Sequence, residues 1–430
     1  MRRFTFWPWR TGFRGLLAAR VRGSRIPPHH LLVIVITVCG LAGCASPTGF
    51  LAPVAARAPG ASEVEMLVAT TRMRTTPAEM FSGERAQTLD FADIVVSIPP
   101  VHQPGKVEDP HQIPGNPATD FVTLKADYND RTEALATFRR LVRTTPKKQV
   151  LVFVHGFNNH FEDAVFRFAQ IVHDSGAEVV PVLFTWPSKG SVFAYGYDHE
   201  SAEYSRDALE DGLRFLAKDP EVGEITVYAH SMGNWVTLEA LRQMAIRDGK
   251  VAEKIRDVIL ASPDVDVNVA EKQITAMGPR AGRPRFFLFA SEDDRALAAS
   301  RALHSDQRLG SIDPDQEPWK GTLRSEGIRS FNLTSAGAGD ITRHDKPFEI
   351  PQVVALVGQI IMSGQTQTDS RVSPGESITR ATAGAAAAVG HAAGLVVSAP
   401  VAIVDPLTRE QYGDQIDAFS RSVQDVVTPQ

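Results

Sequence analysis

The chain has 430 residues, of which 43% are hydrophobic and 22% are charged, with a formal net charge of −5 and two cysteines. This composition is ordinary for a globular protein with a sizeable core, and the length admits two or three domains. An acidic balance argues against nucleic acid as a partner and against electrostatic attachment to anionic lipid.

The first 44 residues form a basic stretch, then an apolar run, and then a short stretch of small residues. They contain seven arginines and no acidic residue, followed by an apolar run over 31–39 and by the tetrapeptide LAGC that ends at Cys44. This order predicts a secretory signal peptide over 1–44, because the apolar run is too short to span a bilayer as a permanent helix. LAGC resembles the bacterial lipobox, which implies that Cys44 is lipidated and becomes the mature N-terminus. The basic stretch is long, and Val21 is an alternative start.

Cleavage before Cys44 would change both charge and cysteine content. Without the seven arginines, 38 basic residues face 50 acidic ones, a net charge of −12, and Cys44 is the only cysteine left. No disulfide and no cysteine metal site is then expected. Attachment to the membrane is expected through acyl chains. Ala45 gives no inner-membrane retention signal of the aspartate type, so resemblance to lipoprotein sorting favours the periplasmic side of the outer membrane.

Composition and periodicity predict the elements in chain order. Residues 45–62 are small, Pro- and Gly-rich and predict a linker. The next segment predicts strands at 64–69, 91–98 and 121–124, a polar turn at 70–72, a long loop over 101–119 and a helix over 131–143. Further strands are expected at 149–154, 179–185, 225–229, 258–261, 286–290 and 328–333. Helices are expected near 161–172, 202–216, 235–245, 296–304 and 351–361, with a loop through 195–197.

This alternation predicts an α/β domain over 63–362, with a mostly parallel sheet covered by helices on both faces. In such sheets the chemistry gathers at the carboxyl ends of the strands. Residues 363–430 are polar and then alanine-rich, and predict a tail that is loosely structured or partly helical. No chemistry is assigned to this tail.

One turn in the middle of the chain carries the strongest signal. The predicted strand 225–229 is followed by Ser231 and then by helical spacing over 235–245. Ala229 and Gly233 stand two positions either side of Ser231, where a sharp strand-to-helix turn needs small residues. Such a turn exposes the serine Oγ and points the next backbone N–H at the same space. The pattern predicts a nucleophile elbow, with Ala229 in place of the more common glycine.

A serine hydroxyl needs a base within hydrogen-bond reach, and that base needs a third group to orient it. The expected chain order is serine, acid, histidine, which leaves His304, His344 and His391 as candidates for the base. We prefer His344, because it lies in a glycine-rich loop after the last predicted strand. His304 lies in or near a predicted helix.

The acid is less clearly specified than the base. Asp294 follows the predicted strand 286–290 and is our first choice, ahead of Asp293 and then Asp264. Asp294 also suits the N-cap of the helix that follows, so a purely structural role is a real alternative.

The oxyanion formed on acyl attack needs two N–H donors. We expect them to be the backbone amides of Met232, just after the serine, and Phe157, in the loop after the predicted strand 149–154. Four further side chains are expected to face substrate: His155, Asn158, Trp186 and His230. No metal-ligand spacing and no phosphate-cradling motif is found, so no metal and no cofactor is expected.

Taken together, these residues resemble those of an α/β-hydrolase. The chain most resembles a bacterial family known only as an α/β-hydrolase domain of unknown function, often found on lipoproteins. The resemblance covers 64–361 and runs through seven motifs: VATTR (68–72), FSGER (81–85), VFVHGFN (152–158), FTWPS (184–188), AHSMGN (229–234), SPDVD (262–266) and DRAL (294–297). It implies the fold and a serine-hydrolase site, and it implies no substrate.

The predicted function is a membrane-anchored serine hydrolase of the cell envelope, acting on carboxylic esters through Ser231, His344 and Asp294. Its expected partners are a small or lipid-like ester and, through Cys44, a membrane; the oligomeric state stays open. The alternative is a non-catalytic binding or scaffold module on a hydrolase fold. A peptidase is a weaker third interpretation, because such members usually carry a cap or propeller insert and none is found here.

Overall fold

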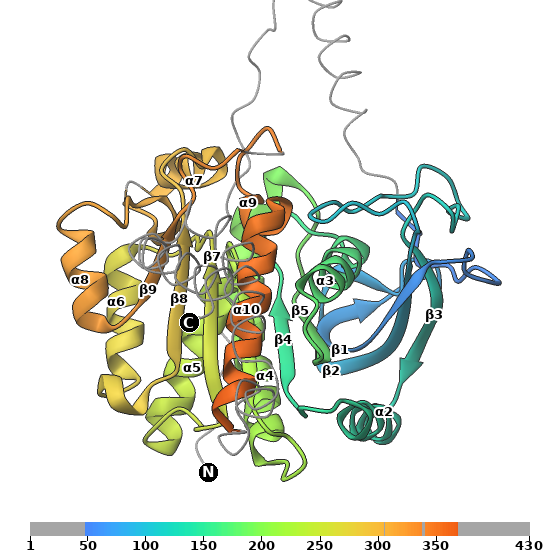
Figure 1. The fold of residues 1–430 in the computed structure, drawn as a ribbon, viewed down its shortest axis with the longest axis horizontal. Helices are drawn as coiled ribbons and strands as arrows, with labels where there is room; N and C mark the ends of the chain where they lie inside the picture. The colour runs from blue at the N-terminus through green and yellow to red at the C-terminus, as the bar shows by residue number, and fades with distance from the viewer. Residues whose placement is uncertain (1–47, 305, 338–339, 369–430) are drawn as a thin grey trace, which may run out of the picture. The chain divides into compact units, whose positions relative to one another are not determined.

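The computed structural model describes residues 48–368 except 305 and 338–339 (Figure 1). One nine-stranded sheet has the order β3-β2-β1-β5-β4-β6-β7-β8-β9. The first three strands pair antiparallel and the remaining pairs are parallel. The strands are β1 (Ser62–Arg74), β2 (Phe81–Ile98), β3 (Val122–Asn129), β4 (Val150–Val154), β5 (Val180–Thr185), β6 (Ile225–His230), β7 (Ile255–Ala261), β8 (Arg285–Ala290) and β9 (Arg329–Asn332).

Helices cover both faces of this sheet, which confirms the predicted α/β architecture. The α-helices of the described residues are α2 (Arg131–Thr144), α3 (Phe161–Ser175), α4 (Tyr195–Lys218), α5 (Gly233–Asp248), α6 (Val267–Ala276), α7 (Arg295–His304), α8 (Trp319–Glu326), α9 (Lys346–Glu349) and α10 (Pro351–Thr368). Short 3₁₀ helices lie at Val192–Ala194, Arg280–Gly282 and Leu309–Ser311.

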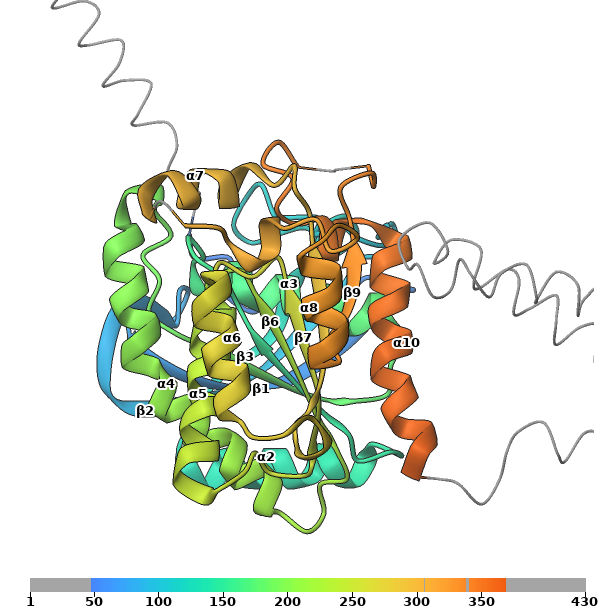
Figure 2. The ribbon, with the colours of Figure 1, turned by 90° about the vertical axis from the view of Figure 1, so that its left-hand side faces the viewer.

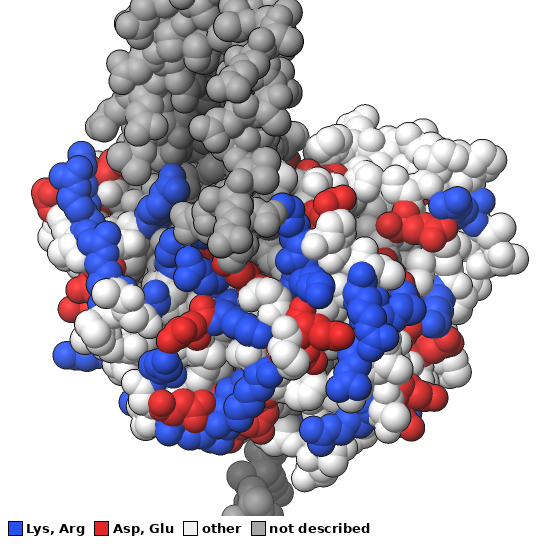
Figure 3. Space-filling model, turned by 60° about the horizontal axis from the view of Figure 1, so that its bottom comes forward, with Lys and Arg blue, Asp and Glu red and all other residues white. Residues whose placement is uncertain are grey.

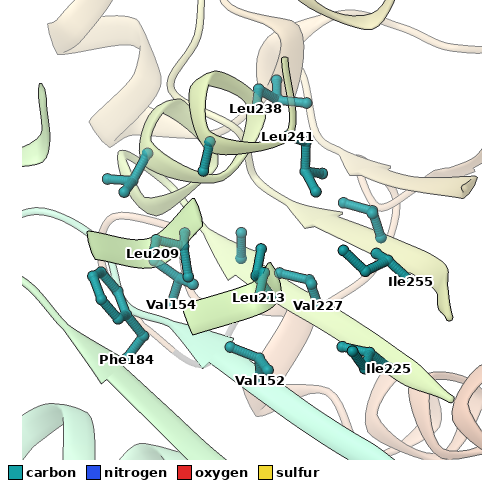
Figure 4. Close-up of a cluster of buried hydrophobic side chains, with 14 of the residues drawn as sticks. Val152, Val154, Phe184, Leu209, Leu213, Ile225, Val227, Leu238, Leu241 and Ile255 are labelled. Carbon is teal, nitrogen blue, oxygen red and sulfur yellow. The ribbon is translucent and has the colours of Figure 1, made fainter. Parts of the chain in front are cut away.

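Each face of the sheet has its own apolar core. On one face, α3 and α10 pack over a core that includes Phe153 and Phe168. On the other face, α2, α4, α5 and α6 cover a second core (Figure 2). Figure 4 shows part of this second core, with Val152 and Val154 of β4 and Leu209 and Leu213 of α4 among its labelled side chains. Burial of these apolar side chains holds the sheet between its two layers.

Several predicted boundaries are wrong; β3, for example, ends at Asn129 and not at residue 124. The predicted polar turn at 70–72 belongs to β1, because β1 and β2 form a long antiparallel ribbon in which Thr70 pairs with Asp90. The side chain of Thr70 is buried and its Oγ1 donates to the Thr185 carbonyl at 3.2 Å. For the same reason β2 begins ten residues earlier than predicted, at Phe81. The predicted loop through Tyr195 is the first turn of α4.

The described part of the predicted linker packs on the domain. The backbone N–H groups of Gly49 and Phe50 donate to the Glu162 carboxylate at 2.9 and 3.0 Å, and Leu51 is fully buried. These contacts hold Gly49 and Phe50 against α3. The predicted signal peptide with Cys44, and most of the predicted tail with His391, lie outside the described residues.

The lower face of the molecule in Figure 1 carries interspersed basic and acidic side chains (Figure 3). Exposed ion pairs of the domain include Arg214–Asp248 at 2.8 Å and Lys250–Glu253 at 2.6 Å. None of the helices in the described part of the chain combines the length and the apolar character needed to cross a bilayer.

Candidate active site

Ser231 lies at the end of β6, in the turn that leads into α5. Its φ is 51°, in the left-handed region that costs a non-glycine residue about 1–2 kcal/mol. Hydrogen bonds hold this conformation: Ser231 N–H donates to the Ala261 carbonyl at 2.9 Å, and the Ser231 carbonyl accepts from Asn234 Nδ2 at 3.1 Å and from Asp264 N–H at 3.2 Å. Ser231 therefore occupies a sharp strand-to-helix turn, the backbone conformation that the sequence pattern predicts.

Two glycines allow the backbone to close around this turn. A Cβ on Gly156 would lie 2.8 Å from Ser231 Cβ, and a Cβ on Gly233 would overlap the carbonyl oxygens of Val154 and His155. The loop after β4 and the first residue of α5 therefore meet at a distance that only glycine permits. This contact brings the β4 loop against Ser231.

Gly233→Ala is expected to destabilise the fold by about 1–3 kcal/mol, because the added methyl group meets backbone oxygens that cannot turn away. Gly212→Ala in α4 is the matched control. A Cβ there meets nothing within 4 Å, so this variant should gain about 0.5–1 kcal/mol from helix propensity. Urea unfolding of both variants measures the two effects, and equal effects would contradict the close packing at Gly233.

The structure brings His344 and Asp294 together. His344 Nδ1 lies 2.6 Å from Asp294 Oδ2. Asp294 also caps α7, because its Oδ1 accepts from Leu297 N–H at 2.9 Å. The two alternatives considered for Asp294, orienting the histidine and capping the helix, therefore coexist, one on each carboxylate oxygen.

His344 lies against the residue that precedes Ser231. The rings of His230 and His344 have centroids 4.7 Å apart. From the neighbouring strand end, Ser262 Oγ donates to the His344 carbonyl at 3.1 Å. Ser231, His344 and Asp294 thus gather at the carboxyl edge of the parallel strands.

The two other candidate acids have different partners. Asp293 forms ion pairs with Lys346 at 2.6 Å and Arg343 at 2.7 Å. Asp264 accepts from Ser300 Oγ at 2.6 Å and from Tyr195 Oη at 2.9 Å. Of the three aspartates, Asp294 is the one in hydrogen-bond contact with the imidazole of His344.

The charge of Asp294 changes the protonation of His344. Burial opposes the imidazolium, but the Asp294 charge and its hydrogen bond outweigh burial and raise the pKa of His344 to about 9. Burial and the nearby charge of His344 lower the pKa of His230 to about 3, so His230 is neutral at physiological pH. Neighbouring histidines are therefore held in opposite protonation states.

Two backbone amides lie next to this turn. Met232 is the N-cap of α5, and Phe157 lies in the β4 loop that Gly156 brings against Ser231. Neither N–H donates a hydrogen bond to another residue within the described part of the chain. Unpaired backbone amides at such a turn are ready donors to a negative oxygen.

The structure corrects the prediction that His155 and Trp186 face substrate. They are 1% and 0% exposed, their rings stack with centroids 4.8 Å apart, and Trp186 Nε1 donates to the His155 carbonyl at 2.9 Å. Their aromatic surfaces pack on each other inside the domain, so neither offers a face to a ligand. The motif identifies the loop, but not which of its side chains turn inward.

The other two predicted substrate residues differ in exposure. Asn158 is exposed, has a φ of 59°, and donates its backbone N–H to Asp198 at 3.3 Å. His230 is nearly buried, and its ring packs between His344 and Phe348. Asn158 is thus accessible to a ligand, whereas His230 supports the ring of His344.

Arg72 is a buried residue of this region to which the sequence pattern assigns no role. Its guanidinium donates to the carbonyls of Ser188 at 3.0 Å and Asn159 at 2.9 Å, and lies 3.3 Å from His155 Nε2. Burial lowers the pKa of Arg72 to about 10 against the opposing charge of Asp198, so it stays charged at neutral pH. Arg72 thereby connects the β4 loop to the loop after β5. The sequence signal that could have identified Arg72 is its position in the VATTR motif.

Arg72→Met is expected to destabilise the fold on the order of 3 kcal/mol, because it leaves buried carbonyls and Asp198 without their cation. The control is Arg57→Met, which removes an exposed ion pair with Glu63 and should change stability by about 1 kcal/mol or less. Urea unfolding checks both. If Arg72→Met lowered the free energy of unfolding no more than Arg57→Met does, the role of Arg72 in connecting the two loops would be contradicted.

A lipase-esterase related protein and a fungal esterase are among the solved structures that are similar to this chain. A lipase-esterase related protein from Clostridium acetobutylicum matches with 13% identity and a TM-score of 0.28, over 51% of this chain and 96% of that one. One of two fungal esterases from Rhizomucor miehei matches with 11% identity and a TM-score of 0.31, over 83% of this chain and 96% of that one. Neither likeness bears on the activity of this chain.

Sequence comparison adds a relative and a family. Uncharacterized protein alr1448 of Nostoc sp. is 23% identical over 133 residues, which cover 25% of this chain and 34% of the relative, so the match spans about a third of that protein's length. The model of the family "Alpha/beta hydrolase of unknown function (DUF900)" matches residues 130–361, more than half of the chain. The protein belongs to this family of alpha/beta hydrolases.

Proposed function

We propose that this protein is a serine hydrolase acting on carboxylic esters, with Ser231 as nucleophile, His344 as base and Asp294 as the residue that orients the histidine. The observation that carries the proposal is the 2.6 Å contact of His344 Nδ1 with Asp294, at the strand edge where Ser231 occupies a positive-φ turn. Nucleophile, base and orienting acid are the three parts that this chemistry requires.

In the proposed reaction, Ser231 Oγ attacks the ester carbonyl and His344 Nε2 takes the hydroxyl proton. The amides of Phe157 and Met232 donate to the oxyanion. The tetrahedral intermediate expels the alcohol, which receives the proton from His344, and leaves an acyl-enzyme on Ser231. Water, deprotonated by His344, then releases the carboxylic acid and restores the serine.

The proposed substrates are lipid-like esters or acylated polymers of the cell envelope. Two exposed apolar side chains support an apolar acyl group: Phe193, in the short 3₁₀ helix that follows β5, and Ile341, in the loop before His344, are 85% and 86% exposed. Ile341 lies three residues before His344. Attachment to the periplasmic side of the outer membrane through a lipidated Cys44 is part of the same proposal, since it would hold the domain close to such esters.

A cavity of about 620 Å³ lies elsewhere in the domain and is not assigned to the acyl group. Leu67, Phe138 and Phe215 are among its lining residues, from β1, α2 and α4. None of the proposed catalytic residues lines it. The proposed active site is therefore located by the positions of Ser231, His344 and Asp294, and not by this cavity.

A panel of aryl esters with acyl chains of increasing length tests the proposal on the full chain. Hydrolysis that depends on Ser231 is the expected result. No hydrolysis of any ester, with binding of the same compounds retained, would favour the alternative of a non-catalytic module on a hydrolase fold.

The pH dependence of kcat/KM follows from the raised pKa of His344. Only the neutral imidazole accepts the serine proton, so kcat/KM should rise with pH and level off above about 9. At pH 7 it should be on the order of 1% of the plateau, since each pH unit below the pKa costs about tenfold. An initial-rate series across pH checks this, and a plateau already reached at pH 7 would contradict it.

A further inference from the structure

A cluster of two histidines and an aspartate lies away from Ser231. His102 is in the loop that follows β2, and His173 and Asp174 are in the last turn of α3 (Figure 1). One potential ligand atom from each residue lies within 4.8 Å of the others. The loop and the helix are far apart in sequence, which is why spacing gives no sign of this cluster.

His102 is held by carboxylates on both ring nitrogens. Nδ1 lies 2.7 Å from Glu108 Oε2, and Nε2 lies 2.8 Å from Asp174 Oδ1. Glu108 is itself fixed, because its Oε1 accepts from Gln103 N–H at 3.1 Å. A carboxylate that orients a histidine through one nitrogen, leaving the other nitrogen for a metal, is the common arrangement around protein metal ligands.

Asp174 is oriented in the same way. Its Oδ2 accepts from Gly105 N–H and from Gln170 Nε2, both at 2.8 Å. Its side chain is 1% exposed and that of His102 is 5% exposed. Asp174 Oδ1 is thus the oxygen that faces His102, and its other oxygen is held by the loop and by α3.

His173 completes the group. The rings of His102 and His173 have centroids 5.4 Å apart. Among the described residues, none forms a hydrogen bond with the side chain of His173. Its imidazole is therefore available as a third ligand, next to two atoms that are already oriented.

We propose that His102 Nε2, Asp174 Oδ1 and one ring nitrogen of His173 bind a divalent transition metal, with zinc the best fit. Two imidazoles and one carboxylate suit Zn²⁺, and water would occupy the fourth position. On binding, the metal replaces the proton that Nε2 shares with Asp174, and that proton is released to solvent. Glu108 continues to accept from Nδ1–H.

The site would join the loop after β2 to α3. The N-terminus of α3 follows the β4 loop of the proposed active site, whereas the cluster is at the C-terminus of this 15-residue helix, about 20 Å away at a rise of about 1.5 Å per residue. The metal is therefore expected to stabilise the fold rather than to take part in ester hydrolysis.

The test is zinc binding by the full chain after treatment with a chelator. Isothermal titration should give one site per chain, and the thermal midpoint should rise with added Zn²⁺. Substituted Co²⁺ should show visible d–d absorption of a low-coordinate nitrogen and oxygen site. This spectrum needs no variant, so a misfolded mutant does not obscure the result.

His173→Ala should weaken zinc binding by about tenfold or more, and Glu108→Gln, which alters only the support of His102, should weaken it about 10–100-fold. His111→Ala is the matched control, because His111 is exposed in the same loop and outside the cluster. Absence of a zinc site, or equal affinity in wild type and His173→Ala, would overturn the proposal. The cluster would then be an ion pair of protonated His102 with Glu108 and Asp174.

Discussion

Ser231→Ala is expected to lower kcat for ester hydrolysis about 10⁵–10⁶-fold, because it removes the atom that forms the acyl-enzyme. The fold should be retained, since Ser231 is held by its backbone N–H and carbonyl, and alanine preserves both. Steady-state kinetics on the ester that wild type hydrolyses best, with thermal unfolding of both proteins, measures the effect.

Ser325→Ala is the matched control for this change. Ser325 is an exposed serine on α8 whose hydroxyl donates to the Thr322 carbonyl, so its loss should leave kcat within about twofold. If Ser231→Ala retained more than a small fraction of wild-type kcat, a different nucleophile would have to be found.

Asp294→Asn is expected to reduce kcat about 10⁴-fold, because His344 would lose both its orientation and the charge that stabilises its imidazolium. Stability at neutral pH should also fall, because the raised pKa of His344 means that its pairing with Asp294 stabilises the fold; the helix cap should be kept, since the amide oxygen of the new side chain can still accept from Leu297 N–H. The rise of kcat/KM with pH should also move to lower pH, because Asp294 would no longer raise the pKa of His344. Initial rates across pH, with urea unfolding, measure these effects.

Asp293→Asn provides the comparison, because Asp293 is the neighbouring aspartate and the second choice from sequence. It pairs with Lys346 and Arg343, whereas the imidazole of His344 contacts Asp294. Its replacement should cost stability but leave kcat within about tenfold. A larger loss of kcat at Asp293 than at Asp294 would assign the orienting role to Asp293 instead.

The parallel part of the fold can be predicted from sequence because its strands are continuous apolar runs. β4 and β5 are buried along their whole length, and such runs stand out between helices with an apolar stripe. The ribbon of β1 and β2 cannot be predicted in full, since it carries Thr70 and Arg72, which resemble turn residues until their buried partners are known. The short helices α6 and α8 are not predicted, because each has few buried side chains.

For the candidate site, the sequence indicates the strand ends but not the direction of every side chain. Motif and chain order select Ser231, Asp294 and His344, and the structure gathers them at one edge; their catalytic roles stay predictions. The inward turn of His155 and Trp186 depends on packing between two loops, which no local pattern encodes.

Labelling with a fluorophosphonate probe, followed by peptide mapping, shows directly whether Ser231 is an activated nucleophile. The probe reacts with an activated serine and needs no knowledge of the substrate. We expect one adduct, on Ser231, that is absent from Ser231→Ala and strongly reduced in Asp294→Asn. No adduct on the folded wild-type protein, or an adduct on another serine, would contradict it.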